Sequence, residues 1–333
     1  MQNSSAKPAT KKGQLALVLG LIAAVISGLG VAIQSKINGQ LGEALDDAVL
    51  TSLFSFSSGW ILCIAVFFLS RNHARQSLKR LFRGLCSGEL PWWALIGGFA
   101  GAFLVFFQSS LVNTIGLAGF TISLVAGSTV GGMVMDVFGV SGITRKLNFL
   151  RGLGATITLG AVILMVSGQL QGNDQWWLLI LPFFAGMVTT FQQATIGLVR
   201  HETKSFTLAT LVSFSAGTVL IFLIWLALLP SQGLPQSWPS EPLLYLGGML
   251  GFIFILTIAI VVRRIGVLLL TLTMTAGQLI GSLVIDLYYP DAYPITALSY
   301  LAIALAMVGV TTAALGLRSS KVKKKKVRPE AQL

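Results

Sequence analysis

An internal duplication constrains this chain more than any other feature of its sequence. Residues 34–62 align with residues 192–220 at a constant offset of 158 residues, and residues 97–136 align with 247–286 at an offset of 150. A length difference of eight residues in the loop between the two blocks reconciles these offsets. The matched residues of the first block are Gln34, Gly39, Ser55, Phe56, Ser57 and Gly59 with Gln192, Gly197, Ser213, Phe214, Ser215 and Gly217. Those of the second block are Gly97, Gly98, Gly101, Gly116, Gly127, Gly131 and Asp136 with Gly247, Gly248, Gly251, Gly266, Gly277, Gly281 and Asp286. The sequence therefore predicts one structural unit that is present twice.

The composition places both copies in a membrane. Hydrophobic residues make up 54% of the chain and charged residues only 10%, whereas a soluble domain carries about 25% charged residues. A membrane-spanning helix needs roughly 20 apolar residues, and the continuous apolar runs favour helices over a barrel of alternating strands. Ten runs fit this length: 14–35, 49–70, 92–113, 117–137, 151–168, 174–199, 206–229, 242–262, 266–287 and 295–317.

The basic residues predict how these helices are oriented. If the N-terminus lies in the cytoplasm, 22 of the 23 Lys and Arg residues fall in cytoplasmic segments, and Lys36 is left in an outer loop. This distribution follows the positive-inside rule and places both termini in the cytoplasm. Five helices per copy is an odd number, so the second copy must cross the membrane in the opposite sense. The predicted fold is an all-α integral membrane protein with ten transmembrane helices in two inverted five-helix repeats, an architecture of many secondary transporters.

The predicted segments follow from these runs. A basic cytoplasmic tail (1–13) precedes the first repeat (14–168), and the second repeat (174–317) is followed by a basic, disordered tail (318–333). The net charge of +12 does not indicate nucleic-acid binding, because the basic residues lie in the cytoplasmic loops and tails. The C-terminal tail is expected to anchor the topology at anionic lipid headgroups, with a regulatory binding site as the alternative.

Repeated glycines at a spacing of four residues predict close helix packing. Small residues let helix backbones approach one another, which matters in lipid because hydrophobic association is absent there. The expected packing positions are Gly97, Gly101, Gly127 and Gly131 in the first copy and Gly247, Gly251, Gly277 and Gly281 in the second. Gly116 and Gly266 lie in the shortest helix connections, where a sharp turn favours a residue without a Cβ.

Two repeated aspartates are the main acidic residues attached to the predicted spans. Asp136 and Asp286 occupy equivalent positions near the ends of the fourth and ninth runs. A negative charge is unfavourable at a helix C-terminus, so each carboxylate needs a specific partner. Each aspartate is either a structural residue bonded to a loop amide or hydroxyl, or a group that titrates or binds substrate. The sequence leaves both readings open.

Side-chain amides form a second set of candidates. A buried amide offers two donors and an acceptor, which can orient a polar solute without carrying charge. The candidate substrate or coupling residues are Gln34, Asn38, Gln192, Gln193 and Gln278, together with the two aspartates. Hydrogen bonding between helices is the alternative role for these amides.

The sequence contains no motif for catalysis, a cofactor or a metal. It lacks a Gly-rich loop followed by Lys and Ser or Thr, a Gly-x-Ser-x-Gly elbow and a His-Glu-x-x-His pair. The cysteines Cys63 and Cys86 have no metal-ligand spacing. We therefore expect a protein that is not an enzyme and has no cofactor or metal site.

The motifs of each copy resemble those of a known family. The first copy reads Gln34-Ser-Lys-Ile-Asn38-Gly39, taken as a glutamine followed by an Asn-Gly turn. Both copies then carry Ser-Phe-x-x-Gly, Gly-Gly-x-x-Gly and Ala-Gly-x-x-x-Gly-x-x-x-Asp. Together these are similar to the YdcZ-like inner-membrane exporters of the drug/metabolite transporter superfamily, in a form with two fused copies.

Some residues depart from this pattern. Ile196 replaces the second copy's Asn, and Ser128 stands in the first copy where the second has Gln278. The proton-binding glutamate in the first helix of the superfamily's small multidrug carriers has no counterpart in the first or sixth run. The coupling ion, whether a proton or another, therefore stays open.

The resemblance implies a secondary-active permease, most simply an exporter of a small metabolite or drug-like solute, that works by alternating access. The scarcity of charge within the predicted spans favours a neutral or zwitterionic solute. The expected partners are this solute and the inner-membrane bilayer, and the protein is expected to be a monomer or homodimer. A non-transporting scaffold or a lipid scramblase is the alternative.

Overall fold

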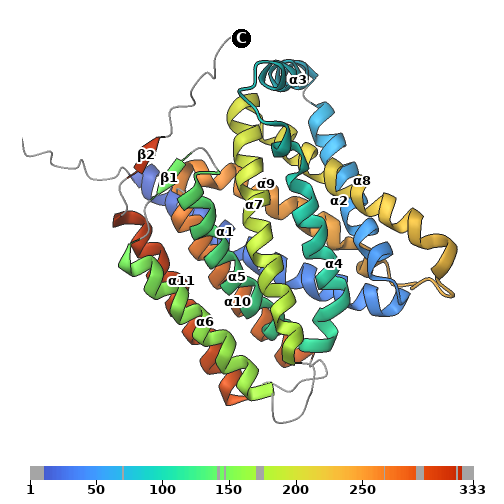
Figure 1. Ribbon diagram of the computed structural model, residues 1–333, viewed down its shortest axis with the longest axis vertical. Coiled ribbons are helices and arrows are strands. Elements are labelled where there is room, and N and C mark those ends of the chain that lie inside the picture. The colour runs from blue at the N-terminus through green and yellow to red at the C-terminus, as the bar shows by residue number, and fades with distance from the viewer. Residues whose placement is uncertain are drawn as a thin grey trace, which may run out of the picture.

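Long helices packed side by side make up almost all of the computed structural model (Figure 1). The structure describes residues 11–69, 71–140, 143–145, 148–169, 176–265, 267–289, 296–319 and 322–324. The helices are α1 (Lys11–Leu45), α2 (Ala48–Leu69), α3 (Arg71–Cys86), α4 (Gly98–Ile115), α5 (Leu117–Phe138), α6 (Phe149–Gln169), α7 (Ile180–Thr203), α8 (Phe206–Gln232), α9 (Gly247–Ile265), α10 (Val267–Tyr288) and α11 (Ala297–Ser319). Short 3-10 turns η1 (Trp92–Gly97), η2 (Trp176–Leu179) and η3 (Pro242–Leu246) precede α4, α7 and α9.

Helices are the expected form for these sequences, because the backbone polar groups of an apolar segment find no water in a bilayer. Among the described residues, six helical segments are long and apolar enough to cross a membrane. They are Val18–Leu45, Ala48–Leu69, Trp92–Ile115, Leu117–Met135, Trp177–Thr203 and Phe206–Gln232. Shorter apolar helical segments are Phe149–Met165, Pro242–Thr257 and Ala297–Ala313. The count of ten spans stays a prediction.

The first helix is longer than the sequence analysis predicted. The expected turn at Asn38 and Gly39 is wrong, because both residues lie within α1, which continues to Leu45. Lys36, which was expected in an outer loop, is also part of α1 and is buried. The reason is tertiary packing: Gly39 lets α4 approach α1 closely, and the Asn38 amide is hydrogen-bonded to α4. A polar Asn-Gly pair is thereby accommodated inside a helix.

Two segments expected without regular structure are also ordered. The basic loop between the second and third apolar runs contains the amphipathic helix α3, which lies at one end of the bundle (Figure 1). In the C-terminal tail, β2 (Val322–Lys324) pairs antiparallel with β1 (Ile143–Arg145), which precedes α6. Backbone pairing therefore orders three residues of a tail that was expected to be disordered. Arg318 and Ser319 form the end of α11, and the remaining tail residues lie outside the described part of the chain.

Glycine-mediated contacts join helices of the first copy to helices of the second. A Cβ on Gly98 of α4 would overlap the carbonyl oxygen of Ser213 in α8, and a Cβ on Gly248 of α9 would overlap that of Ser55 in α2. The two contacts are equivalent, because Gly98 aligns with Gly248 and Ser213 aligns with Ser55 in the internal repeat. The rings of Phe56 and Phe214, which match each other, lie 5.3 Å apart between α2 and α8.

The same reciprocity extends to two other helix pairs. Gly127 of α5 meets the Phe183 carbonyl of α7, and its match Gly277 of α10 meets the Val25 carbonyl of α1. Gly131 and Gly281, one turn further on, also pack against α7 and α1 respectively. The remaining helices of the two copies, α6 and α11, pack along each other at one side of the bundle (Figure 1). Gly127, Gly131 and Gly277 therefore lie where helix backbones approach closely. A Cβ on four other expected positions would instead meet side chains of neighbouring helices: Gly97, Gly101, Gly247 and Gly251.

Candidate functional site

Two matched glutamines lie over two matched glycines between the helices. A Cβ on Gly101 of α4 would overlap the side-chain amide of Gln192 in α7, and a Cβ on Gly251 of α9 would lie 2.8 Å from Nε2 of Gln34 in α1. Gln192 Nε2 donates to Ser213 Oγ at 2.9 Å. The missing side chains at the two glycines thus make room for amides in the interior of the bundle.

A second polar cluster joins α1 to α4 and has no counterpart in the other copy. Asn38 Nδ2 donates to Gln108 Oε1 at 2.8 Å, and Gln108 Nε2 donates to Ser35 Oγ at 2.9 Å. All three side chains are fully buried. At the matching positions of the second copy stand Ile196, Ile258 and Gln193.

Gln108 is the site residue that the sequence analysis missed. Gln108 has no matching glutamine in the second copy, where Ile258 stands. The signal that could have found it is a glutamine inside the apolar run 92–113, because a polar side chain in a span must find a partner or face water.

The other amide candidates lie in different surroundings. Gln193 is exposed on α7, whereas its match Ser35 is buried. Gln278 is half-buried on α10, and its Nε2 atom is buried without a hydrogen-bond partner among the described residues. Gly28 of α1 packs against the backbone of α10 at Gln278. The candidates therefore do not converge on one point, although Gln34, Asn38 and Gln278 all lie at contacts of α1.

Asp286 bonds to the start of a neighbouring helix. The aspartate is 5% exposed near the end of α10, and its Oδ2 atom accepts from the backbone N–H of Ala118 at 2.7 Å. Ala118 lies in the first turn of α5, where free N–H groups and the helix dipole favour a negative charge. Gly116, with a φ of +77°, forms the sharp turn that directly precedes α5. The side chain of the matching Asp136 lies outside the described residues.

Matched positions on α1 and α7 differ sharply in exposure. Gly39 is buried, and a Cβ there would lie 3.0 Å from the Cβ of Val112 in α4. Its match Gly197 on α7 is exposed, and no described atom lies within 4 Å of a Cβ built there. Ser35 and Gln193, one turn earlier, differ in the same sense. At these two positions, α7 is therefore exposed where the matching residues of α1 are covered by α4.

A cavity of about 10 Å³ lies between α2, α8 and α9 and is lined by Cys63, Phe206, Thr207, Thr210, Phe252 and Leu256. This volume accommodates about one water molecule and no larger solute. Among the described residues, no cluster of three His, Cys, Asp or Glu side chains could hold a metal ion.

Comparison with known proteins places these features in a family. The sequence model of the family described as "Putative inner membrane exporter, YdcZ" matches the chain twice, over residues 19–164 and 177–312. This chain belongs to that family. The two matches correspond to the two copies of the repeat, which confirms the fused form and the family that the motifs indicated.

One bacterial relative has about the length of a single copy. The inner membrane protein YdcZ of Escherichia coli (strain K12) is 27% identical over 146 residues, which are 44% of this chain and 89% of that protein. A solved structure described only as the crystal structure of a protein shares the fold at a TM-score of 0.52. It has 17% sequence identity and covers 92% of this chain and 98% of its own. The family match and this relative support a multi-pass inner-membrane protein with a general role in transport.

Proposed function

We propose that this YdcZ family member is a secondary-active exporter of a small solute, which works by alternating access between two inverted repeats. Ten spans with both termini in the cytoplasm account for the distribution of basic residues. The reciprocal contacts, Gly98 with Ser213 and Gly248 with Ser55, support a two-fold relation between the copies. In such transporters, the solute site lies between the repeats, and one repeat rocks against the other.

The difference between α1 and α7 is the observation that carries this proposal. In the proposed topology, Gly39 and Val112 lie toward the outer side, where α1 and α4 are packed together. The matching positions, Gly197 and Val262, lie toward the cytoplasm, where Gly197 is exposed. The arrangement corresponds to a carrier that is closed outside and open inside. If the outer end of α1 became exposed and the inner end of α7 became covered, the carrier would be open outside and closed inside.

The groups available to a solute are amides and hydroxyls. Gln34 and Gln192 lie at the contact of the two copies, and Gln193 lies on the exposed face of α7. Such groups recognise a polar solute by hydrogen bonds and need no opposite charge. We therefore propose a neutral or zwitterionic solute. Its transport is driven by an ion gradient or by its own gradient, since the sequence has no ATP-binding motif.

A pair of crosslinks tests the mechanism and the function together. In a variant without Cys63 and Cys86, the pair Gly39→Cys and Val112→Cys should form a disulfide that locks the outer side shut. The matching pair, Gly197→Cys and Val262→Cys, should form one only in the opposite state. Small molecules released by cells that overproduce each variant, the parent or no protein are compared before and after oxidation.

The expected result is a released compound that depends on the parent protein, disappears when either pair is oxidised and returns on reduction. The single-cysteine variants are the controls and should release it throughout. Release that continues with both pairs crosslinked would contradict alternating access. If overproducing and empty cells release the same compounds, the exporter proposal fails and a scaffold or a lipid scramblase replaces it. Movement of labelled lipid between the leaflets of reconstituted vesicles would identify the scramblase.

A further inference from the structure

The helix α3 carries a basic surface whose charges the transport mechanism does not use. Its inner face, with Ala74, Ser77 and Leu81, is buried. Ala74 and Leu81 pack with Phe67 of α2, and Val199 of α7 belongs to the same cluster. Arg80 is held at the end of α7, where it donates to the carbonyl of Thr203 at 3.4 Å. This packing fixes which side of α3 faces away from the bundle.

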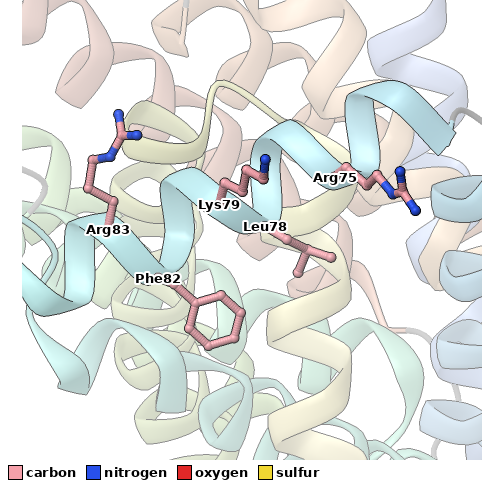
Figure 2. A pocket seen from close by; sticks show the side chains of 5 residues that line it. All are labelled: Arg75, Leu78, Lys79, Phe82 and Arg83. Atoms are coloured by element: carbon pink, nitrogen blue, oxygen red, sulfur yellow. The ribbon is translucent and has the colours of Figure 1, made fainter.

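The outward side of α3 combines cations with an exposed aromatic ring. Arg75, Lys79 and Arg83 recur at intervals of four residues, so they lie along one face of the helix and are all exposed. Phe82 lies beside them and is 63% exposed. Together with Leu78, these residues line an open groove of about 590 Å³. Figure 2 shows Lys79 and Arg83 on one side of the helix and Leu78 and Phe82 on the other.

The position of α3 brings this surface to the boundary of the bilayer. One residue separates α3 from the end of α2, and the segment Ala48–Leu69 is a candidate membrane span. Leu78 packs against the bundle, and Phe82, one turn later on the same side, remains exposed beyond it. A surface helix with basic residues on one side and an exposed Phe on the other is typical of helices that lie in the headgroup region.

We propose that α3 binds the headgroups of anionic phospholipids through Arg75, Lys79 and Arg83, while Phe82 inserts among the acyl chains. The charges are complementary to lipid phosphates, and the long Lys and Arg side chains can reach the headgroups from a helix whose apolar side lies deeper. This binding is independent of the proposed export.

A nitroxide spin label on Phe82→Cys, in a chain without Cys63 and Cys86, reports the depth of this position in reconstituted vesicles. In vesicles that contain phosphatidylglycerol, we expect the label to be accessible to oxygen and protected from a water-soluble relaxing agent. In vesicles of phosphatidylcholine alone, the label should be more exposed to water. Protection in both kinds of vesicle would show insertion without selection of anionic lipid and would overturn the proposal, as would exposure in both.

Charge variants test the headgroup contacts. Native mass spectrometry compares bound phosphatidylglycerol with bound phosphatidylcholine on the intact parent and on Arg75→Gln/Lys79→Gln/Arg83→Gln. Each surface cation contributes about 1 kcal/mol of attraction to anionic lipid, so the preference should fall by about tenfold or more. The control, Lys323→Gln/Lys324→Gln/Lys325→Gln, removes the same charge from the tail. Because the tail is itself expected near headgroups, this control should lower the preference, but by less than the α3 variant.

The outcomes of this comparison are distinct. An equal loss in both triple variants would mean that net charge alone attracts lipid and would overturn a site on α3. Inorganic phosphate that protects the label in phosphatidylcholine vesicles would assign the cations to a free phosphate instead. The three side chains are exposed, so the melting temperature in neutral detergent should not change. A lower value together with lost lipid would mean that these residues hold the fold, which would also overturn the proposal.

Discussion

At the scale of single residues, the closest contacts in the bundle depend on the absence of a side chain. Gly98 and Gly248 face backbone carbonyl oxygens, which cannot move aside as a flexible side chain can. Overpacking a tight interior typically costs about 1–3 kcal/mol. We expect Gly98→Ala and Gly248→Ala each to lower the thermal stability of the purified protein clearly.

Other helical glycines provide a matched control for this prediction. No described atom lies within 4 Å of a Cβ built on Gly30 or Gly132, so Gly30→Ala and Gly132→Ala should be neutral or slightly stabilising. Thermal unfolding of the four variants in one detergent measures the difference. Equal effects in both pairs would mean that helix propensity, rather than close approach, decides the outcome.

The Asp286 carboxylate gives a second prediction at this scale. It accepts from the Ala118 amide at the start of α5, which is the role of a helix cap. Asp286→Asn keeps an acceptor oxygen and should retain both fold and export. Asp286→Ala removes the acceptor and should lower the stability by about 1–2 kcal/mol.

Unfolding and export assays on both Asp286 variants separate structure from transport. Loss of export in a stably folded Asp286→Asn protein would show that the charge itself is needed. That result would return the aspartate to the transport mechanism as a titrating or solute-binding group.

At the scale of helices, apolar runs and small residues allowed much of the fold to be predicted. Every apolar run falls on a helix, and repeated glycines such as Gly98 and Gly127 lie at close contacts between helices. The structure of the polar segments was harder to predict from the sequence. The end of α1 was missed because Asn38 is paired by α4, a partner that local sequence cannot reveal.

For the basic segment before α4, the sequence analysis used only the Lys and Arg residues, which predicted a cytoplasmic location. Its apolar residues, Ala74, Leu78, Leu81 and Leu85, recur at helical spacing and could have predicted α3. For the candidate site, repetition led to Gln34 and Gln192 but not to the unrepeated Gln108. The burial of Gly39 and the exposure of Gly197 depend on how the helices pack. This difference could not be predicted from the sequence, because the two copies carry a glycine at both positions.

At the scale of the whole molecule, the cluster of Ser35, Asn38 and Gln108 should hold the outer side closed. Asn38→Leu/Gln108→Met replaces the amides with apolar groups of similar shape and removes both hydrogen bonds. A buried hydrogen bond contributes about 0.5–1.5 kcal/mol net, so the two together correspond to about 5–150-fold in an equilibrium. We expect outer-side labelling of a cysteine at position 39 to rise by about tenfold.

Membrane-impermeant maleimide on oriented vesicles measures this change. Labelling of a cysteine at position 193 from the cytoplasmic side should fall at the same time, because the two sides exchange accessibility. A rise at position 39 without the fall at position 193 would indicate local loosening rather than a change of state.

The unrepeated amide pair has a consequence for the resting state of the carrier. A transporter of two identical inverted subunits has inward and outward states of equal energy, whereas this chain makes the Asn38–Gln108 bond on one side only. The bond does not set the direction of net transport, which the gradients determine. Under the proposed alternating access, it would set the resting state: the empty carrier would spend most of its time open to the cytoplasm, and opening outward would be the slow step. In that mechanism, two fused copies that differ in sequence would allow the two halves of the transport cycle to have different rates.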